Sequence, residues 1–364
     1  MMDTSRKPTV FLTGATGLVG SYFLTLLLQD NHNVFALVRK NPGAEAEERV
    51  KAVLDFWDKK TFNAYKRNLA VVTGDITAAG DLGLCARDRK AVRNGTEVVF
   101  NCAAITDFNR AADDINRINS DGTRNLFDFA LQCPHLKKIN HISTLYVCGN
   151  YAGRFDEKML DGGQSFNSAY EKSKFEAEKI AGEYRQKKLW IDIFRPPIIL
   201  GESTTGKIPT FNRALYQALH LWNREFFTRY PVEKNYKLTT VFVDDFCRSV
   251  LIISSKNSVP NKTYHPFAPA AVLPDYIADL TCKRLGKTPP EYVTYEKFIQ
   301  GNPTPSQLRL LKPNLLFIDR PAVFDSTATL DLLARDGFRF TPLNEGSFNT
   351  LLDFCIRKGY LTEV

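Results

Sequence analysis

The stretch Val10-Phe11-Leu12-Thr13-Gly14-Ala15-Thr16-Gly17-Leu18-Val19-Gly20 joins an apolar run to three glycines at every third position. It predicts a strand, a tight turn and then a helix. Gly14 can take up the turn, Gly17 lets the backbone approach a pyrophosphate, and Gly20 lets the helix lie on the strand. Because the N-terminus of a helix attracts anions, the stretch predicts a dinucleotide site. Its expected contacts are Gly14, Thr16, Gly17, Leu18, Val19 and Gly20.

Composition places the chain among ordinary globular proteins, with 364 residues, 44% hydrophobic and 24% charged. The N-terminus is polar and no apolar run approaches the roughly 18 residues of a membrane span, so we expect a cytoplasmic protein without an integral membrane segment. The seven cysteines show no C-x-x-C pair. We expect them to be reduced and mostly buried, with no metal site.

The net charge is +8 and the sequence pI is near 9.0, which favours an anionic partner. Nucleic acid is disfavoured because the basic residues are scattered and no nucleic-acid motif accompanies them. Dinucleotide phosphates, coenzyme A or an acidic carrier protein would each account for the excess.

A second strand is predicted at residues 33–38, and Arg39 follows it directly. An NAD-binding fold usually carries an acid at this place, which bonds the ribose 2′-hydroxyl. A guanidinium instead can pair with a 2′-phosphate. Arg39 therefore favours NADPH, while an ordinary surface arginine is the alternative.

Strands and helices alternate through the first 200 residues, which predicts an α/β fold with a Rossmann-type, doubly wound parallel sheet. The further strands expected after 33–38 end near residues 75, 101 and 144, and the last covers 191–201. We assign residues 1–200, with 238–262 returning to them, to an NADP-binding domain. Residues 201–237 and 263–364 would form a smaller, mostly helical substrate-binding lobe.

Several small or polar residues follow these strands, at the sheet edge where open α/β folds bind ligands. Asp75 could reach an adenine amine, although a plain Gly-Asp turn is equally consistent with the local sequence. We predict further cofactor contacts at Ile76, Ala103, Ala104 and Pro197.

Tyr170 and Lys174 lie four residues apart in a clear helical pattern, so they share one helix face. A cation beside a phenol lowers the pKa of the phenol and suits it to proton transfer. Thr144 adds a hydroxyl at the end of the fifth predicted strand. The spacing of the pair alone is common by chance, but together with the glycine stretch it becomes specific.

These motifs, in this order, resemble the extended short-chain dehydrogenase/reductase superfamily over residues 9–201. The resemblance implies that Thr144 bonds the reacting carbonyl oxygen and that Tyr170 exchanges the proton. It implies that Lys174 holds the nicotinamide ribose and lowers the Tyr170 pKa, and that Asn119 supports the proton relay through its helix. Members of the superfamily more often have serine at position 144, but the hydroxyl is retained here.

Residues 35–39, the Glu/Arg-rich helix at 45–50 and the stretch 72–84 resemble the thioester reductase branch, which includes fatty acyl-CoA reductases and terminal reductase domains of peptide synthetases. This implies NADPH-dependent reduction of a CoA- or carrier-bound acyl thioester to an aldehyde, and in some members on to an alcohol. The alternatives are an NAD(P)-dependent dehydrogenase or epimerase of a sugar nucleotide or secondary alcohol, and a protein that binds NADP without chemistry.

An apolar stripe at helical spacing runs through residues 209–227. Such a stripe is more often core than ligand wall. It could also line a tunnel for an acyl chain, with Tyr216 and Phe227 at its margin.

Overall fold

A computed structural model describes residues 6–106, 110–232, 238–256, 259–268, 273–315 and 322–363. The chain divides into two compact units. The first unit comprises residues 1–149, 168–196 and 247–266, and the second comprises 150–167, 197–246 and 267–364.

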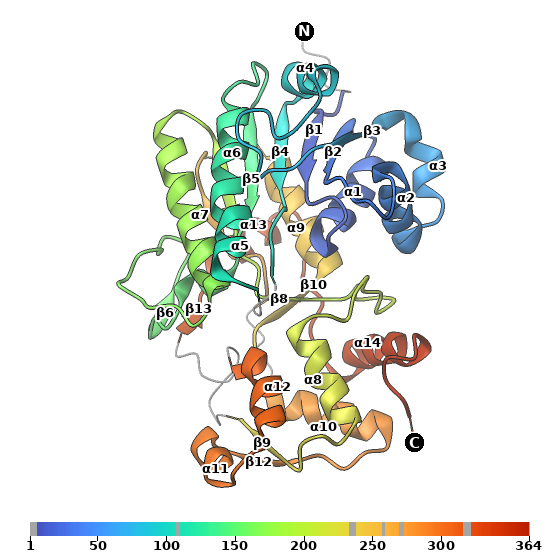
Figure 1. The fold of residues 1–364 in the computed structure, drawn as a ribbon, viewed down its shortest axis with the longest axis vertical. Coiled ribbons are helices and arrows are strands. Elements are labelled where there is room, and N and C mark those ends of the chain that lie inside the picture. Colours follow the sequence, from blue (N-terminus) through green and yellow to red (C-terminus); the bar gives the residue numbers. More distant parts are fainter. Residues whose placement is uncertain are drawn as a thin grey trace. The chain divides into compact units, whose positions relative to one another are not determined.

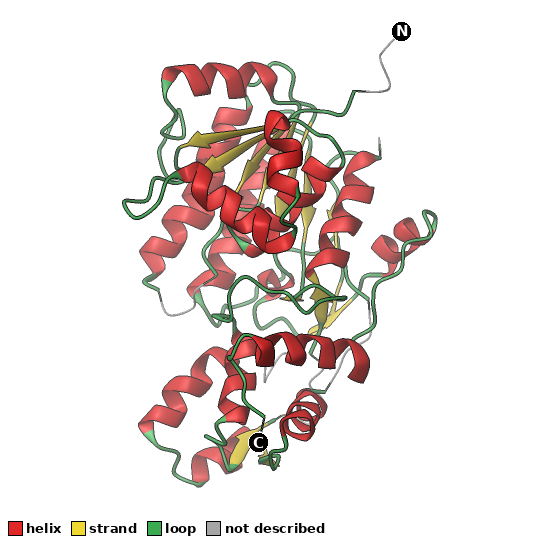
Figure 2. Ribbon diagram, turned by 90° about the vertical axis from the view of Figure 1, so that its right-hand side faces the viewer, coloured by secondary structure: helices red, strands yellow, loops and turns green. Residues whose placement is uncertain are grey.

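Within the described residues, the first unit is built on a parallel sheet of seven strands in the order β11-β7-β5-β4-β1-β2-β3 (Figures 1 and 2). The strands are β1 (Val10–Thr13), β2 (Val34–Val38), β3 (Leu69–Thr73), β4 (Val98–Asn101), β5 (Lys138–Ile142), β7 (Ile191–Phe194) and β11 (Thr263–Tyr264). The predicted doubly wound α/β fold is therefore confirmed. The strand order reverses between β1 and β4, which is where such folds bind ligands.

Helices connect these strands and cover both faces of the sheet (Figure 2). They are α1 (Leu18–Gln29), α2 (Ala46–Trp57), α3 (Thr61–Tyr65), η1 (Lys66–Asn68), α4 (Ala86–Gly95), α5 (Ala112–Asn116), η2 (Arg117–Asp121), α6 (Gly122–Ala130), η3 (Leu145–Cys148) and α7 (Ala169–Gln186). Alternate residues of each strand face opposite sides. Thus Phe11, Val99 and Ile139 share one core cluster with Leu126 and Phe127 of α6.

One predicted strand is wrong in extent. The expected strand 191–201 is two strands, β7 in the main sheet and β8 (Ile198–Leu200), which pairs with β10 (Thr240–Phe242). Pro196 and Pro197 lie between them, and proline has no N–H to continue a ladder. The division between the two units falls at the same two prolines.

The second unit contains short parallel pairs and helices within the described residues. The pairs are β8 with β10, β9 (Arg229–Pro231) with β12 (Glu291–Val293), and β6 (Gly153–Phe155) with β13 (Ala322–Phe324). The helices are α8 (Ala214–Asn223), α10 (Pro274–Leu285), α11 (Tyr295–Gln300), α12 (Pro305–Leu315), α13 (Thr327–Ala334) and α14 (Glu345–Arg357). Helix α9 (Val243–Ser255) crosses from the second unit into the first.

The segment 150–167, expected in the first domain, lies in the second unit because β6 pairs with β13. An Arg154–Asp325 ion pair and a hydrogen bond from Thr329 N to Glu157 hold the same segment. The assignment of one part to cofactor and the other to substrate remains a prediction.

The apolar stripe of residues 209–227 forms α8 and its flanks. Tyr216 is fully buried, and its hydroxyl accepts a hydrogen bond from Gly201 N. Phe227 is also buried, against Tyr230 and Phe298. These contacts favour core over a ligand wall for both residues.

Candidate functional site

The glycine stretch forms the predicted turn between β1 and α1, and two of its glycines are required by contact. Gly14 has φ +69°, and a Cβ there would lie 2.7 Å from the carbonyl carbon of Cys102. A Cβ at Gly20 would lie 2.1 Å from Gly14 O, so helix and turn touch directly. Gly17 is the N-cap residue of α1, and the nearest atom to its Cβ position would be Gly14 O at 3.3 Å.

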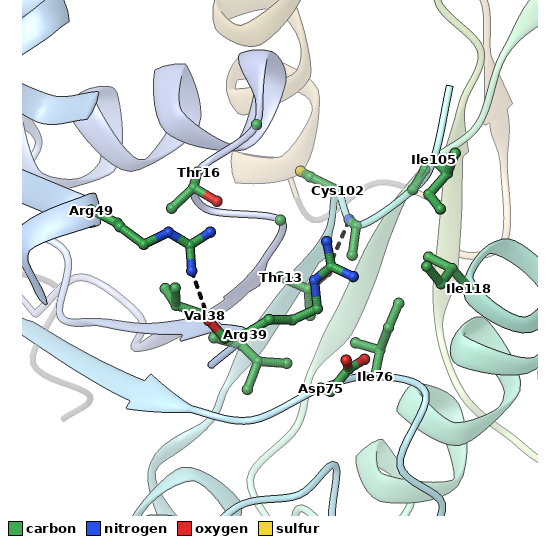
Figure 3. Close-up of a pocket in the computed structure, with 15 residues that line it drawn as sticks. Thr13, Thr16, Val38, Arg39, Arg49, Asp75, Ile76, Cys102, Ile105 and Ile118 are labelled. Carbon is green, nitrogen blue, oxygen red and sulfur yellow. Dashed lines mark hydrogen bonds between the residues drawn. The ribbon is translucent and has the colours of Figure 1, made fainter. Parts of the chain in front are cut away.

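A pocket of about 210 Å³ opens beside this turn (Figure 3). Its walls come from the carboxyl ends of β1, β2, β3 and β4, with one residue from α2 and one from η2. The lining residues are Thr13, Gly14, Thr16, Gly17, Leu37, Val38, Arg39, Arg49, Asp75, Ile76, Cys102, Ala103, Ala104, Ile105 and Ile118. The first turn of α1 contains no acidic residue, and no side chain caps its N-terminus. The pocket therefore joins a glycine cradle and a helix N-terminus to an apolar floor, which fits a dinucleotide.

Two guanidinium groups line the pocket, those of Arg39 after β2 and Arg49 in α2 (Figure 3). Arg49 Nη1 donates a hydrogen bond of 2.7 Å to Arg39 O. Among the described residues neither guanidinium forms an ion pair with a carboxylate. Two uncompensated cations at one edge of a dinucleotide pocket suit an anionic group.

Asp75 takes part in a turn and in the pocket wall. Its Oδ1 accepts a hydrogen bond of 2.9 Å from Thr77 N, and its own N–H donates to Leu82 O at 2.7 Å. The Gly-Asp turn is therefore present, and Asp75 also lines the pocket. A contact between Asp75 and an adenine amine stays a prediction. Ile76 is buried against Gly122, where a Cβ would lie 2.7 Å from Ile76 Cδ1.

A buried polar row crosses three strands beneath the pocket. Thr13, Asn101 and His141 occupy paired positions of β1, β4 and β5. Thr13 Oγ1 donates to Asn101 Oδ1 (2.8 Å) and accepts from Ala103 N (3.2 Å), and Asn101 Nδ2 lies 3.0 Å from His141 Nδ1. Burial holds the pKa of His141 well below its usual value, so the ring is neutral. The row fixes the backbone of Ala103 in the pocket wall.

The predicted helix that carries Tyr170 and Lys174 is α7. Its N-cap is Ser168, whose hydroxyl accepts a hydrogen bond of 3.2 Å from Glu171 N. Tyr170 and Lys174 lie in the first turns of α7, 8% and 2% exposed, on one helix face. Both residues are therefore buried on neighbouring turns of α7.

Lys174 is held against the end of β5. Its Nζ donates a hydrogen bond of 2.7 Å to Ile142 O. Burial lowers the pKa of Lys174 to about 8, against the opposing effects of Glu178 and Cys102. Near neutral pH the ammonium form is still present, which is the form that stabilises a phenolate.

Thr144 follows β5 and is the N-cap of η3. Its Oγ1 accepts a hydrogen bond from Tyr146 N at 3.3 Å, and the residue is 3% exposed. Ser143, directly before it, donates through Oγ to Glu178 Oε1 of α7. The strand end that carries Thr144 is thus bonded to the helix that carries Tyr170.

Asn119 links the pocket to α7. Its side chain accepts from Ile105 N (2.8 Å) and donates to Ile105 O (3.0 Å) and to Ser173 Oγ (2.9 Å). It is fully buried in η2, which is a π-helical turn between α5 and α6. Ile105 lines the pocket, so one amide side chain joins the pocket wall to the residue before Lys174.

The structure brings together most of the predicted cofactor residues. Leu18, Val19 and Gly20 form the first turn of α1 but do not line the described pocket, and Pro197 belongs to the second unit. Thr144, Tyr170, Lys174 and Asn119 are also outside the lining and lie on elements bonded to it. Pocket residues that were not predicted are Thr13, Leu37, Val38, Arg49, Cys102, Ile105 and Ile118.

Three further findings bear on the site. The second unit has equal numbers of basic and acidic residues, so the net charge of +8 lies in the first unit, with the pocket.

In the part of the chain that the structure describes, no three His, Cys, Asp or Glu side chains gather as metal ligands would. Within the same part, no helix has the length and apolarity that a membrane crossing requires.

Comparison with known proteins adds independent information. A family profile described as "Male sterility protein", of an NAD-binding type, matches residues 12–250. A probable fatty acyl-CoA reductase 5 of Arabidopsis thaliana is 31% identical over 170 residues, covering 42% of this chain and 34% of that protein. The non-canonical nonribosomal peptide synthetase FrzA of Cladobotryum sp. is 26% identical and covers 98% of this chain and 37% of its own length.

The chain spans about a third of the length of these curated relatives. Among solved structures, the terminal R domain of the myxalamid PKS-NRPS biosynthetic pathway superposes with a TM-score of 0.86 at 23% identity, covering 98% of this chain and 93% of that one. That likeness supports the fold. Since the family profile matches well over half of the residues, this protein belongs to the male sterility protein family, in the thioester reductase-like branch of the extended short-chain dehydrogenases/reductases.

Proposed function

We propose that this protein reduces an acyl thioester to an aldehyde with NADPH, and that Tyr170 donates the proton. The observation that carries the proposal is the link between pocket and helix. Asn119 bonds Ile105 of the pocket wall and Ser173 of α7, next to a buried Tyr170 and Lys174. A dinucleotide bound in the pocket would therefore lie beside a proton donor with a neighbouring cation.

The cofactor assignment rests on the pocket itself. A Cβ at Gly14 or Gly20 would collide with backbone, so only glycine leaves this turn intact beside a pyrophosphate. Arg39 and Arg49 supply two cations at the end of β2, where a 2′-phosphate would lie. Charge-assisted pairing of this kind would favour NADPH over NADH.

NADPH, when bound, supplies the hydride that adds to the thioester carbonyl carbon. Tyr170 would give its hydroxyl proton to the carbonyl oxygen, and Thr144 would donate a hydrogen bond to the same oxygen. Lys174, as an ammonium, would stabilise the phenolate that remains. The product of this two-electron step is a hemithioacetal, which collapses to an aldehyde and a free thiol.

The substrate class is proposed from the relatives. A fatty acyl-CoA reductase and a peptide synthetase are both among them, and coenzyme A and carrier proteins present acyl groups as thioesters. The carrier of the thiol, CoA or a carrier protein, is left for experiment, as is a second reduction to an alcohol.

The test is NADPH oxidation by the purified chain against a panel of acyl-CoA and acyl-carrier thioesters of graded chain length, with products identified by mass spectrometry. We expect oxidation that depends on the thioester and releases one thiol per aldehyde. The matched control is Tyr170→Phe, which keeps the ring and removes the acid. Turnover of sugar nucleotides or secondary alcohols, with none across the thioester panel, would contradict the proposal.

A further inference from the structure

A buried ion pair lies behind the catalytic segments, in the first unit. Arg195 and Glu178 are 1% and 2% exposed. Arg195 Nη2 donates to Glu178 Oε2 (2.7 Å) and Arg195 Nε donates to Oε1 (2.9 Å), which is a bidentate arrangement. Arg195 Nη1 lies 3.4 Å from Nε2 of the buried His265.

Each end of this pair reaches a segment that the proposed reaction uses. Glu178 accepts from Ser143 Oγ, one residue before Thr144, and it follows Lys174 by one turn of α7. Arg195 precedes Pro196, whose carbonyl accepts a hydrogen bond of 3.0 Å from Leu145 N, one residue after Thr144. The two residues that flank Thr144 are thus both held: Ser143 by Glu178, and Leu145 by Pro196, the neighbour of Arg195.

We propose that Glu178, held by Arg195, is a positioning residue for the reaction: it fixes the strand end that carries Thr144 and supplies the negative charge that partners Lys174. This inference rests on the proposed function. An ion pair that only stabilised the fold would not need to contact the segments that carry Thr144 and Lys174. Apolar residues of similar size can often replace a buried ion pair without loss of stability.

The ion pair also has an electrostatic effect on Lys174. Burial disfavours the ammonium of Lys174, and the Glu178 carboxylate counters this effect by raising the Lys174 pKa. Arg195 engages both oxygens of that carboxylate, so Glu178 does not bind the ammonium outright and Lys174 stays available to a phenolate. Loss of Glu178 would leave Lys174 with less compensation and let it lose its proton at lower pH.

Other titratable groups around Lys174 are few among the described residues. Cys102, after β4, acts on it, and Lys174 in turn lowers the pKa of His141 on β5. Tyr170 shares its helix face, and Tyr146 lies in η3, which packs on α7. The adjoining π-helical turn bonds α7 through the uncharged Asn119 and Ser120.

The test measures the Lys174 titration directly, by NMR of lysine labelled with ¹³C at Cε, with the signal assigned through Lys174→Met. The main variant is Glu178→Gln combined with Arg195→Gln, because Glu178→Gln alone leaves a buried guanidinium unpaired and endangers folding. Glu178→Asp is the conservative variant. Glu183→Gln is the control, since Glu183 lies on α7 like Glu178 and its ion pair with Arg124 of α6 is exposed.

We expect the double variant to shift the Lys174 midpoint to lower pH, and to shift the alkaline fall of kcat/KM with it. Glu178→Asp should restore most of the midpoint, and Glu183→Gln should leave it unchanged. NADPH affinity should be unchanged throughout. An unmoved midpoint in a folded double variant overturns the inference. A shifted midpoint in a protein that reduces no thioester refutes the proposed function, and with it the role of Glu178 in that reaction.

Discussion

Three glycine-to-alanine variants test the cofactor cradle, because the structure gives each glycine a different surrounding. At Gly20 a Cβ would lie 2.1 Å from Gly14 O and 2.7 Å from Gly14 C. Real Cβ atoms essentially never lie under 3.0 Å from another heavy atom of this kind, so the turn or α1 must move by about an ångström. Gly14 has little room to move away, because backbone atoms of Cys102 and Ala103 lie directly beside it.

The expected cost of Gly20→Ala is about 1–3 kcal/mol of stability, as for overpacked cores. NADPH binding should weaken by roughly tenfold or more, because misplacement by an ångström is costly at a binding site. Gly17→Ala meets Gly14 O only at 3.3 Å, so it should fold normally. It should nevertheless bind NADPH more weakly, because its methyl group would lie where the pyrophosphate approaches.

The control is Gly182→Ala, in the interior of α7, where a Cβ meets no atom within 4 Å. It should stabilise the protein by about 0.5–1 kcal/mol, since glycine is costly inside helices, and leave NADPH affinity unchanged. The assays are thermal unfolding and titration with NADPH by fluorescence. Native stability and native NADPH affinity in Gly20→Ala would refute the prediction that this glycine turn binds the cofactor.

Three further predictions address single residues. Arg39→Asp should raise the KM for NADPH about 10- to 100-fold, because charge-assisted hydrogen bonds contribute about 1.5–3 kcal/mol. The KM for NADH should change little. Equal changes for both cofactors would contradict a 2′-phosphate site. The proposed reaction needs Lys174 as an ammonium, and burial lowers the pKa of Lys174 to about 8. The value of kcat/KM should therefore be constant below that pH and fall as pH rises through it. Lys174→Arg, which stays charged, should remove this fall, and an unaltered profile would exclude Lys174 as its source. Asn119→Ala leaves Ile105 N and O without the Asn119 side chain as their partner, so both thermal stability and NADPH affinity should drop. If both are retained, Asn119 does not link the pocket to α7.

Local spacing made part of this site predictable. Three glycines after an apolar run specify the turn, and the four-residue spacing of Tyr170 and Lys174 places both on one face of α7. The alternation of strands and helices likewise predicts the parallel sheet. Such features depend on neighbours in sequence, so they can be recognised without coordinates.

Tertiary contacts account for what was missed. Arg49 reaches the pocket from the first turn of α2, and nothing in its local sequence marks that side of the helix. Glu178 and Arg195 are 17 residues apart and are joined only by the packing of α7 on the segment after β7. By contrast, the split of strand 191–201 was readable from Pro196 and Pro197.

The central claim is that Tyr170 protonates the carbonyl oxygen of a thioester as hydride arrives. The most direct measurement is a single turnover of wild type and Tyr170→Phe, each saturated with NADPH, on an acyl thioester that the wild type reduces. We expect Tyr170→Phe to bind NADPH as tightly as the wild type but to form aldehyde at least about 100-fold more slowly. Aldehyde formation at the wild-type rate by Tyr170→Phe would contradict it.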